Sequence, residues 1–173
     1  MKKDYFFNFQ KYAYIKSAKP DGCIFCLIRD RHPSVTDLSV HRDKLFIVTV
    51  NLYPYNPGHL LIFPTRHIED VRNYIPEEEQ RLNELTRYFL DIADTVHRPA
   101  GYNIGYNMGH SAGASIDHLH LHLIPRYPHE TGIADLIAGK RVLVEEPRET
   151  ARRIRETVEQ NPFRNPFPEQ PAD

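Results

Sequence analysis

The sequence has few cysteines, little net charge and no long apolar run. Only 2 of its 173 residues are cysteines, which argues against a framework of several disulfides. The formal net charge of −1 offers no electrostatic basis for binding nucleic acid or an anionic membrane surface. A membrane-spanning helix needs about 18 consecutive apolar residues, and the sequence contains no such stretch. The first ten residues do not read as a signal peptide. We therefore expect a cytoplasmic protein that binds neither nucleic acid nor membrane.

The order of the elements along the chain favours an α+β fold with a mostly antiparallel sheet. An apolar stripe at helical spacing predicts one long helix over 76–97, and a weaker pattern predicts a short one at roughly 148–160. Strands are predicted at 45–50, 59–64, 102–107 and 141–146. The expected units are an N-terminal arm at residues 1–20, a domain at 21–146, and a C-terminal helix with a proline-rich tail at 147–173.

The stretch "DHLHLHLIPR" places a histidine at every second position, at His118, His120 and His122. In a β-strand these three side chains share one face, and the intervening leucines line the other. The leucine face is an ordinary core face. A polar face turned to water would carry a mixture of residue types rather than one type three times. The alternation therefore predicts a functional site on the histidine face.

The segment "NMGHSAGAS", residues 107–115, runs directly into the histidines. Glycine and serine alone are compatible with a flexible hairpin loop, but they also allow backbone N–H groups to form a concave nest for phosphate. A neutral imidazole is a good nucleophile towards phosphorus when an acceptor holds its other ring nitrogen. His120, the middle histidine, is best suited to that role, and His122 would orient neighbouring groups or stabilise charge on the phosphate.

The remaining cysteines and histidines leave alternatives open. Cys23 and Cys26 form a single Cys-x-x-Cys, which fits a redox pair, half of a zinc site or two buried small residues. His32 lies near them, but its polar, proline-flanked context favours the surface. The histidines expected to be exposed among charged or turn residues are His41, His97 and His129. His110 lies in the glycine-rich loop, and the sequence leaves its function open.

Four ordered blocks of the sequence resemble the histidine triad (HIT) superfamily of nucleotide hydrolases and transferases. The blocks are "CIFC", "NLYPYNPGHLLIFPTRH", "NMGHSAGAS" and "HLHLHLI" with the following "PR". The resemblance implies a HIT-like α+β fold and a homodimer. In that family the middle triad histidine attacks an α-phosphate and forms a nucleotidyl-histidine intermediate. By this comparison His120 is the nucleophile, and His59 and His122 lie in the phosphate site.

The resemblance also implies residues that bind the substrate. Asn51 stands where the family contacts the ribose, while Asn107 and Ser115 match residues that contact phosphate or steady the nucleophile. Gly113 belongs to the same phosphate-binding loop. A nucleotide and inorganic phosphate are therefore the expected partners.

A metal site follows from the same comparison. In related triad proteins, and in relatives of galactose-1-phosphate uridylyltransferase, the first triad histidine and the histidine after a Pro-x-x-His turn complete a Cys-x-x-Cys pair. Here those residues are His118 and His67, beside Cys23 and Cys26. Two thiols and two imidazoles suit a tetrahedral structural zinc ion.

Within the superfamily, the chain looks most like the branch of diadenosine tetraphosphate phosphorylases. That branch transfers the nucleotidyl group to phosphate, converting diadenosine tetraphosphate and phosphate to ATP and ADP. The chain has Ala114 where many superfamily members have glutamine, and Tyr127 where the branch typically has tryptophan. The alternatives are a HIT hydrolase of dinucleoside polyphosphates or nucleoside phosphoramidates, and a nucleotide-binding regulatory module.

Overall fold

A computed structural model describes residues 21–128 and 145–163 of the chain. The N-terminal arm at 1–20, the tail beyond residue 163 and His129 lie outside these ranges, as does most of the strand predicted at 141–146.

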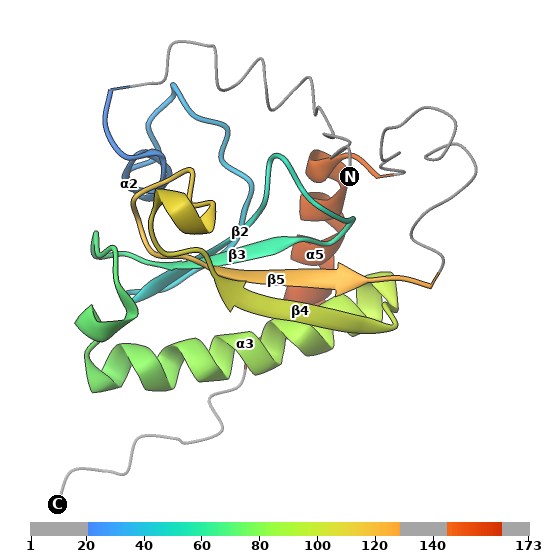
Figure 1. Cartoon of the computed structure of the whole chain (residues 1–173). Coiled ribbons are helices and arrows are strands. Elements are labelled where there is room, and N and C mark those ends of the chain that lie inside the picture. The colour runs from blue at the N-terminus through green and yellow to red at the C-terminus, as the bar shows by residue number, and fades with distance from the viewer. Residues whose placement is uncertain (1–20, 129–144, 164–173) are drawn as a thin grey trace, which may run out of the picture.

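Within the described ranges five strands form one antiparallel sheet in the spatial order β1-β2-β3-β5-β4 (Figure 1). The strands are β1 (Ser39–Arg42), β2 (Phe46–Val50), β3 (Leu60–Pro64), β4 (Gly101–Tyr106) and β5 (Leu121–Arg126). Strand β3 is central, and β5 pairs with it so that Leu61 lies opposite His122. The mostly antiparallel sheet confirms the predicted fold class.

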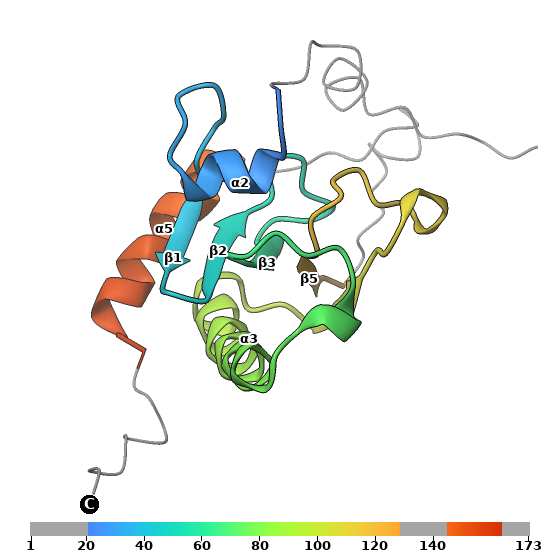
Figure 2. The same cartoon turned by 90° about the vertical axis from the view of Figure 1, so that its left-hand side faces the viewer.

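Helices lie on both sides of this sheet (Figure 2). The long helix α3 (Pro76–His97) packs on β2, β3 and β5, and α5 (Pro147–Gln160) packs on β1 and β2. The short helix α2 (Ile24–Arg29) lies across the opposite face. Helix α3 spans the predicted residues, with Pro76 in its first turn. No helix in the described part of the chain is both long and apolar enough to cross a membrane.

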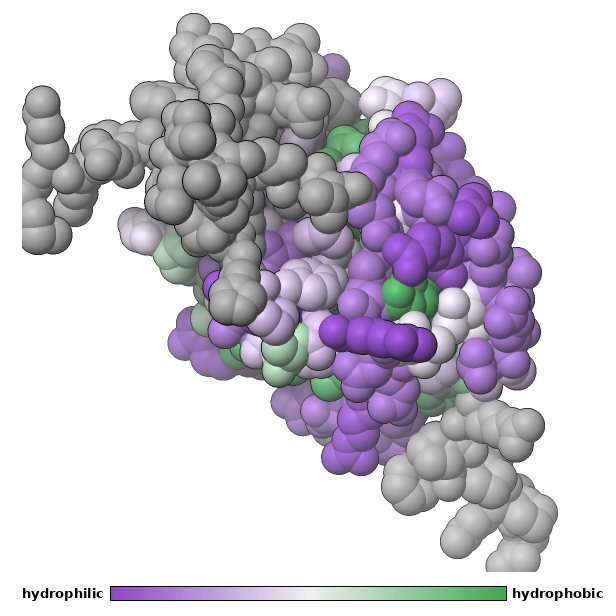
Figure 3. All heavy atoms as spheres, turned by 90° about the vertical axis from the view of Figure 1, so that its right-hand side faces the viewer, coloured by the Kyte–Doolittle hydropathy of each residue, from purple (hydrophilic) through white to green (hydrophobic). Residues whose placement is uncertain are grey.

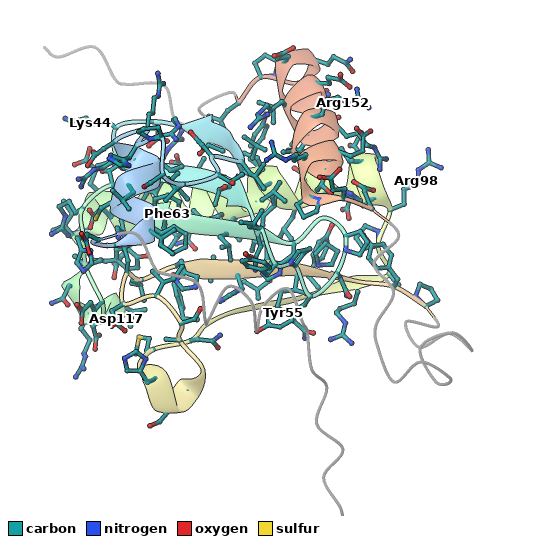
Figure 4. The ribbon with its side chains drawn as sticks, turned by 90° about the horizontal axis from the view of Figure 1, so that it is seen from above. Lys44, Tyr55, Phe63, Arg98, Asp117 and Arg152 are labelled. Atoms are coloured by element: carbon teal, nitrogen blue, oxygen red, sulfur yellow. The ribbon has the colours of Figure 1, made fainter. Side chains whose placement is uncertain are left out.

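The alternation of side chains along the strands divides the core between the two faces. One face packs against α3 and α5 through the buried residues Val48, Val50, Leu60, Ile62, Leu121, Leu123, Leu85, Phe89 and Ile154. The other packs against α2 through Phe25, Ile28, Ile47, Leu61 and Phe63. Figure 4 labels Phe63 next to α2, and its ring stacks on that of Phe25 with 4.3 Å between centroids. Because both faces are covered, β2 and β3 are buried along their whole length.

The structure differs from the sequence prediction around the histidines. Strand β5 begins at Leu121, so only His122 of the three histidines lies within a strand. The preceding residues bond to a loop instead of a neighbouring strand, since Leu119 N–H donates to the carbonyl of Ile68. Helix α2 and strand β1 were not predicted, because elements of six and four residues are too short to show a clear period.

Hydrophilic side chains cover most of the coloured surface in Figure 3.

Candidate active site and metal centre

Three of the predicted site histidines come together on the face of the sheet that α2 covers. His59 lies just before β3 and His122 lies on β5, and the two share a hydrogen bond of 3.0 Å between His59 Nε2 and His122 Nδ1. The ring centroids of His120 and His122 are 4.7 Å apart. All three side chains are buried. The arrangement brings together the residues that the sequence analysis assigned to catalysis.

The hydrogen bond to the His120 ring determines which of its nitrogens can react. His120 Nδ1 lies 2.7 Å from the carbonyl oxygen of His118. A carbonyl only accepts hydrogen bonds, so Nδ1 carries the proton and Nε2 carries the lone pair. Burial lowers the pKa of His120, which keeps the ring neutral at pH 7. His120 Nε2 therefore has the protonation state that a nucleophile needs.

The protonation of His59 and His122 follows from the same kind of reasoning. Tyr55 N–H donates to His59 Nδ1 at 3.2 Å, and the Asn51 amide nitrogen approaches the same atom at 3.2 Å. His59 Nδ1 is therefore an acceptor, and His59 Nε2–H donates to His122 Nδ1. Burial, together with the neighbouring His122 and His120, lowers the pKa of His59 to about 3, so it is neutral. A neutral His122 then carries its proton on Nε2, where it can act as a donor.

The loop between β2 and β3 carries His59 and packs against Pro125 and His97. Asn56 donates through its side-chain amide to the carbonyl of Pro125. Gly58 has a φ of +79°, and a Cβ atom placed there would lie 3.0 Å from His97 Nδ1 and 3.1 Å from Pro125 Cγ. Only glycine combines that backbone conformation with such a close approach.

Two of the histidines expected to be exposed are not. The side chain of His97 is only 4% exposed and bonds to Glu145, and that of His41 is 17% exposed and bonds to Asp43. Both predictions were wrong, because local sequence does not show what a later segment will cover. His97 braces the loop before His59, and no local pattern in the sequence indicated this.

The glycine-rich loop before the histidines is a tight turn around η2 (His110–Ala112). Gly109 and Gly113 have φ values of +80° and +91°. The backbone N–H groups of residues 112–114 donate to carbonyls within this turn. Contacts from the loop to a phosphate would therefore come from its other amides and its serine hydroxyls.

The other predicted substrate-binding residues lie at the two ends of this loop. Ser115 is exposed and Asn107 is partly buried. Ala114, at the position where many superfamily members have glutamine, is buried, and its carbonyl oxygen lies 3.2 Å from His110 Nδ1. Figure 4 shows Asp117 on the chain that leads from this loop towards the histidines.

Cys23, Cys26, His67 and His118 form a second cluster at the edge of the first. Their donor atoms all lie within 4.8 Å of one another. His118 Nδ1 is 3.4 Å from Cys23 Sγ and 3.7 Å from Cys26 Sγ, and His67 Nδ1 is 3.4 Å from Cys26 Sγ. Bond lengths to a tetrahedral zinc ion imply an N–S separation of about 3.6 Å. This group could therefore hold a metal ion.

The surroundings of the cluster orient its imidazoles towards that position. His118 Nε2–H donates to the carbonyl of Pro64 at 2.9 Å, which leaves the Nδ1 lone pair facing the thiols. His67 Nε2 lies 3.5 Å from a carboxylate oxygen of Glu69. Burial and the neighbouring Cys23 raise the pKa of Cys26 to about 11, an effect that a bound cation would reverse.

The other sequence alternatives for the cysteines fit less well. Both thiols are free, so they do not form a disulfide. His32 is exposed and bonds to Ser34, outside the cluster. The donor set is thus the one that the resemblance implied.

Sequence comparison finds relatives of this chain among known proteins. A phosphorylase named AP-4-A phosphorylase from Mycobacterium tuberculosis is 35% identical over 124 residues, which cover 69% of this chain and 64% of that protein. An asymmetrical bis(5'-nucleosyl)-tetraphosphatase from Schizosaccharomyces pombe is 33% identical over 97 residues, 56% of this chain and 53% of that protein. The chain thus spans less than two thirds of the length of either relative.

Solved structures show the same architecture. The crystal structure of a hypothetical histidine triad nucleotide-binding protein from Sulfolobus tokodaii matches with a TM-score of 0.64 and 26% identity, covering 80% of this chain and 93% of that one. The family model described as HIT domain matches residues 32–129. Because that match spans more than half of the 173 residues, the protein belongs to the HIT domain family.

Proposed function

We propose that this protein is a nucleotidyl transferase that cleaves dinucleoside polyphosphates through a covalent intermediate on His120. The observation that carries the proposal is the hydrogen bond from His120 Nδ1–H to the His118 carbonyl, which leaves the Nε2 lone pair for attack. In the first step Nε2 bonds to the α-phosphorus, and the bond from that phosphorus to the bridging oxygen breaks. The remaining nucleotide leaves with the electron pair.

The neighbouring histidines would stabilise the charge that develops on the phosphate. His122 donates from Nε2 to a non-bridging oxygen, and its orientation is set by the hydrogen bond from His59. Because both rings are neutral and buried, their dipoles are arranged before the substrate binds. Asn51 and the loop residues Asn107, Gly113 and Ser115 are the proposed contacts to ribose and phosphate.

Inorganic phosphate is the proposed acceptor in the second step. A phosphate oxygen attacks the nucleotidyl-histidine, the P–N bond breaks, and Nε2 recovers its lone pair. Diadenosine tetraphosphate and phosphate then yield ATP in the first step and ADP in the second. Two observations support this acceptor: Ala114 offers no side-chain amide that could position water, and one relative is named a phosphorylase. The relative named a tetraphosphatase favours hydrolysis as the second candidate.

Zinc is the proposed occupant of the four-residue cluster. Two thiolates and two imidazoles form the soft tetrahedral donor set that zinc prefers, and the observed N–S separations fit it. The ion would serve a structural role and hold its ligands in place. The free thiols are consistent with a reducing compartment such as the cytoplasm.

A homodimer is the proposed assembly. Within the described residues β4 is an edge strand whose centre is exposed, with Ile104 exposed by 48%. An open edge with an apolar side chain is a surface that another copy could cover.

The test is product analysis after incubation of purified protein with diadenosine tetraphosphate, with and without inorganic phosphate. We expect ATP and ADP only when phosphate is present, and a radiolabelled adenylyl group that stays on wild-type protein but not on the His120→Ala variant. Release of AMP at the same rate without phosphate would mean that the protein is a hydrolase and not a phosphorylase. Tight nucleotide binding without any product would indicate a regulatory module.

A further inference from the structure

His118 belongs to both clusters at once. Its imidazole faces the thiols of Cys23 and Cys26, while its backbone carbonyl accepts the hydrogen bond from His120 Nδ1–H. Its Nε2–H donates to the carbonyl of Pro64, at the end of β3. A shift of His118 as a whole therefore moves both the imidazole that faces the thiols and the carbonyl that holds His120 in its reactive tautomer.

The Cys-x-x-Cys segment contacts the nucleophile by a second route. Phe25 lies between the two cysteines in the sequence, and its ring meets the His120 ring edge-on at a centroid distance of 5.0 Å. The same ring stacks on Phe63 at 4.3 Å and contacts the His118 ring at 5.6 Å. The short helix that carries Cys26 thus also supplies an apolar wall for His120.

The third ligand segment connects to the same place. Ile68, which follows His67, accepts a hydrogen bond from Leu119 N–H, directly between His118 and His120. Three stretches distant in sequence therefore meet around the nucleophile, and every one of them carries a ligand of the cluster. A metal ion bound there would link all three.

We infer that metal binding positions the nucleophile, and that metal occupancy controls the rate of nucleotidyl transfer rather than the affinity for nucleotide. The inference rests on the proposed role of His120. A six-residue helix and a loop hold little structure of their own, so the ion supplies the constraint that keeps the His118 carbonyl and the Phe25 ring against His120. His118 and Phe25 are then positioning residues for the reaction.

The test compares zinc-loaded protein, chelator-treated protein and two variants by ¹⁵N NMR of selectively labelled histidine. In the loaded protein we expect His120 to show one protonated Nδ1 and one unprotonated Nε2. In folded metal-free protein, and in His67→Ala, which removes a half-exposed ligand, we expect averaged signals from both tautomers. Adduct formation in a single turnover should fall by about tenfold to a hundredfold. The dissociation constant for a non-cleavable nucleotide should change less than threefold.

Phe25→Leu keeps all four ligands and tests the second route if metal removal unfolds the protein. We expect full zinc content, intermediate tautomer averaging and a smaller loss of rate. Ile154→Val is the matched control, because it truncates a buried side chain on the α5 side of the sheet and should alter neither the His120 signals nor the rate.

The outcomes separate this inference from the proposed function. A single Nδ1–H tautomer and an unchanged rate in folded metal-free protein and in Phe25→Leu would overturn the coupling. The NMR signals report on it even if the loaded enzyme forms no adduct, a result that would overturn the proposed function alone. Cobalt reconstitution should restore both the tautomer and the rate.

Discussion

The two faces of the sheet are both buried, yet they are held together by different interactions. The face towards α3 and α5, called the helix face below, is filled by aliphatic and aromatic side chains. It is stabilised by the removal of apolar surface from water. The face towards α2, called the site face below, combines a smaller apolar cluster with four buried histidines. On that face every nitrogen lone pair and proton must be accounted for.

The difference shows that one sheet can bury an apolar core on one face and a cluster of imidazoles on the other. Burial of an imidazole costs free energy, and the site face offsets this cost by keeping the rings neutral and hydrogen-bonded. The helix face requires no such arrangement and provides the stable platform. Changes on the helix face should therefore alter stability, and changes on the site face should alter chemistry.

The largest effect should come from removing the nucleophile. His120→Ala should lower turnover by roughly 10³-fold or more, because the covalent path is lost, while nucleotide binding persists. Steady-state assays, thermal unfolding and nucleotide titration measure the three properties. Near-normal turnover by a folded variant would remove His120 from the mechanism.

The opposite pattern should follow a truncation on the helix face. Leu85→Ala, at a fully buried position of α3, should lower the free energy of unfolding by about 2–5 kcal/mol through loss of burial and creation of a cavity. The activity per folded molecule at low temperature should stay near the wild-type value. Urea denaturation and assays at 15–20 °C, a range chosen at roughly the temperature of maximum stability, would check this, and a large loss of activity would contradict the division between the faces.

The cysteine–histidine cluster should couple the metal content of the protein to its stability. Purified protein should contain about one zinc per chain, and Cys23→Ser should lower both metal content and the unfolding midpoint, because ion binding is coupled to folding. Elemental analysis and thermal unfolding are the measurements. Protein purified without chelator that has no metal and undiminished stability would speak against the site.

The buried histidines should make stability depend on pH. The pKa of His59 is about 3 in the folded state, below its ordinary value of 6.5, so between these values the unfolded chain binds the additional proton. His59 therefore stabilises the fold less as the pH falls from about 6.5 towards 3, by about 1.4 kcal/mol per pH unit. Urea denaturation at pH 7, 6 and 5 should show a shallower pH dependence for His59→Asn than for wild type. Parallel slopes would mean that His59 titrates normally.

The smallest effect should come from Ala114→Gln, which adds a side-chain amide to the glycine-rich loop that is proposed to bind phosphate. We expect a larger share of AMP relative to ADP in the products, because the amide can position water. Chromatography of products at several phosphate concentrations measures the share. An unchanged ratio would mean that Ala114 does not select the acceptor.

Much of the fold was predictable because its signals are local. The apolar period of residues 76–97 gave α3 its bounds, and the short apolar run in "HLLIFP" gave β3 within one residue. The weaker elements were missed for a physical reason: α2 and β1 are held by side chains that pack from elsewhere, such as Phe25 on Phe63. These two elements are stabilised by tertiary contacts, so no local sequence pattern predicts them.

The candidate site divides in the same way. The sequence by itself singled out the candidate residues, since alternating histidines, a Cys-x-x-Cys pair and a glycine-rich loop are chemical signals that can be recognised without knowing any contacts. Only the tertiary structure decided their states: which nitrogen of His120 holds the proton, that His97 is buried behind Gly58, and that His118 contacts both the thiols and His120. Those properties depend on atoms that the chain brings together from distant positions, and hydrogen bonding and burial act only once they meet.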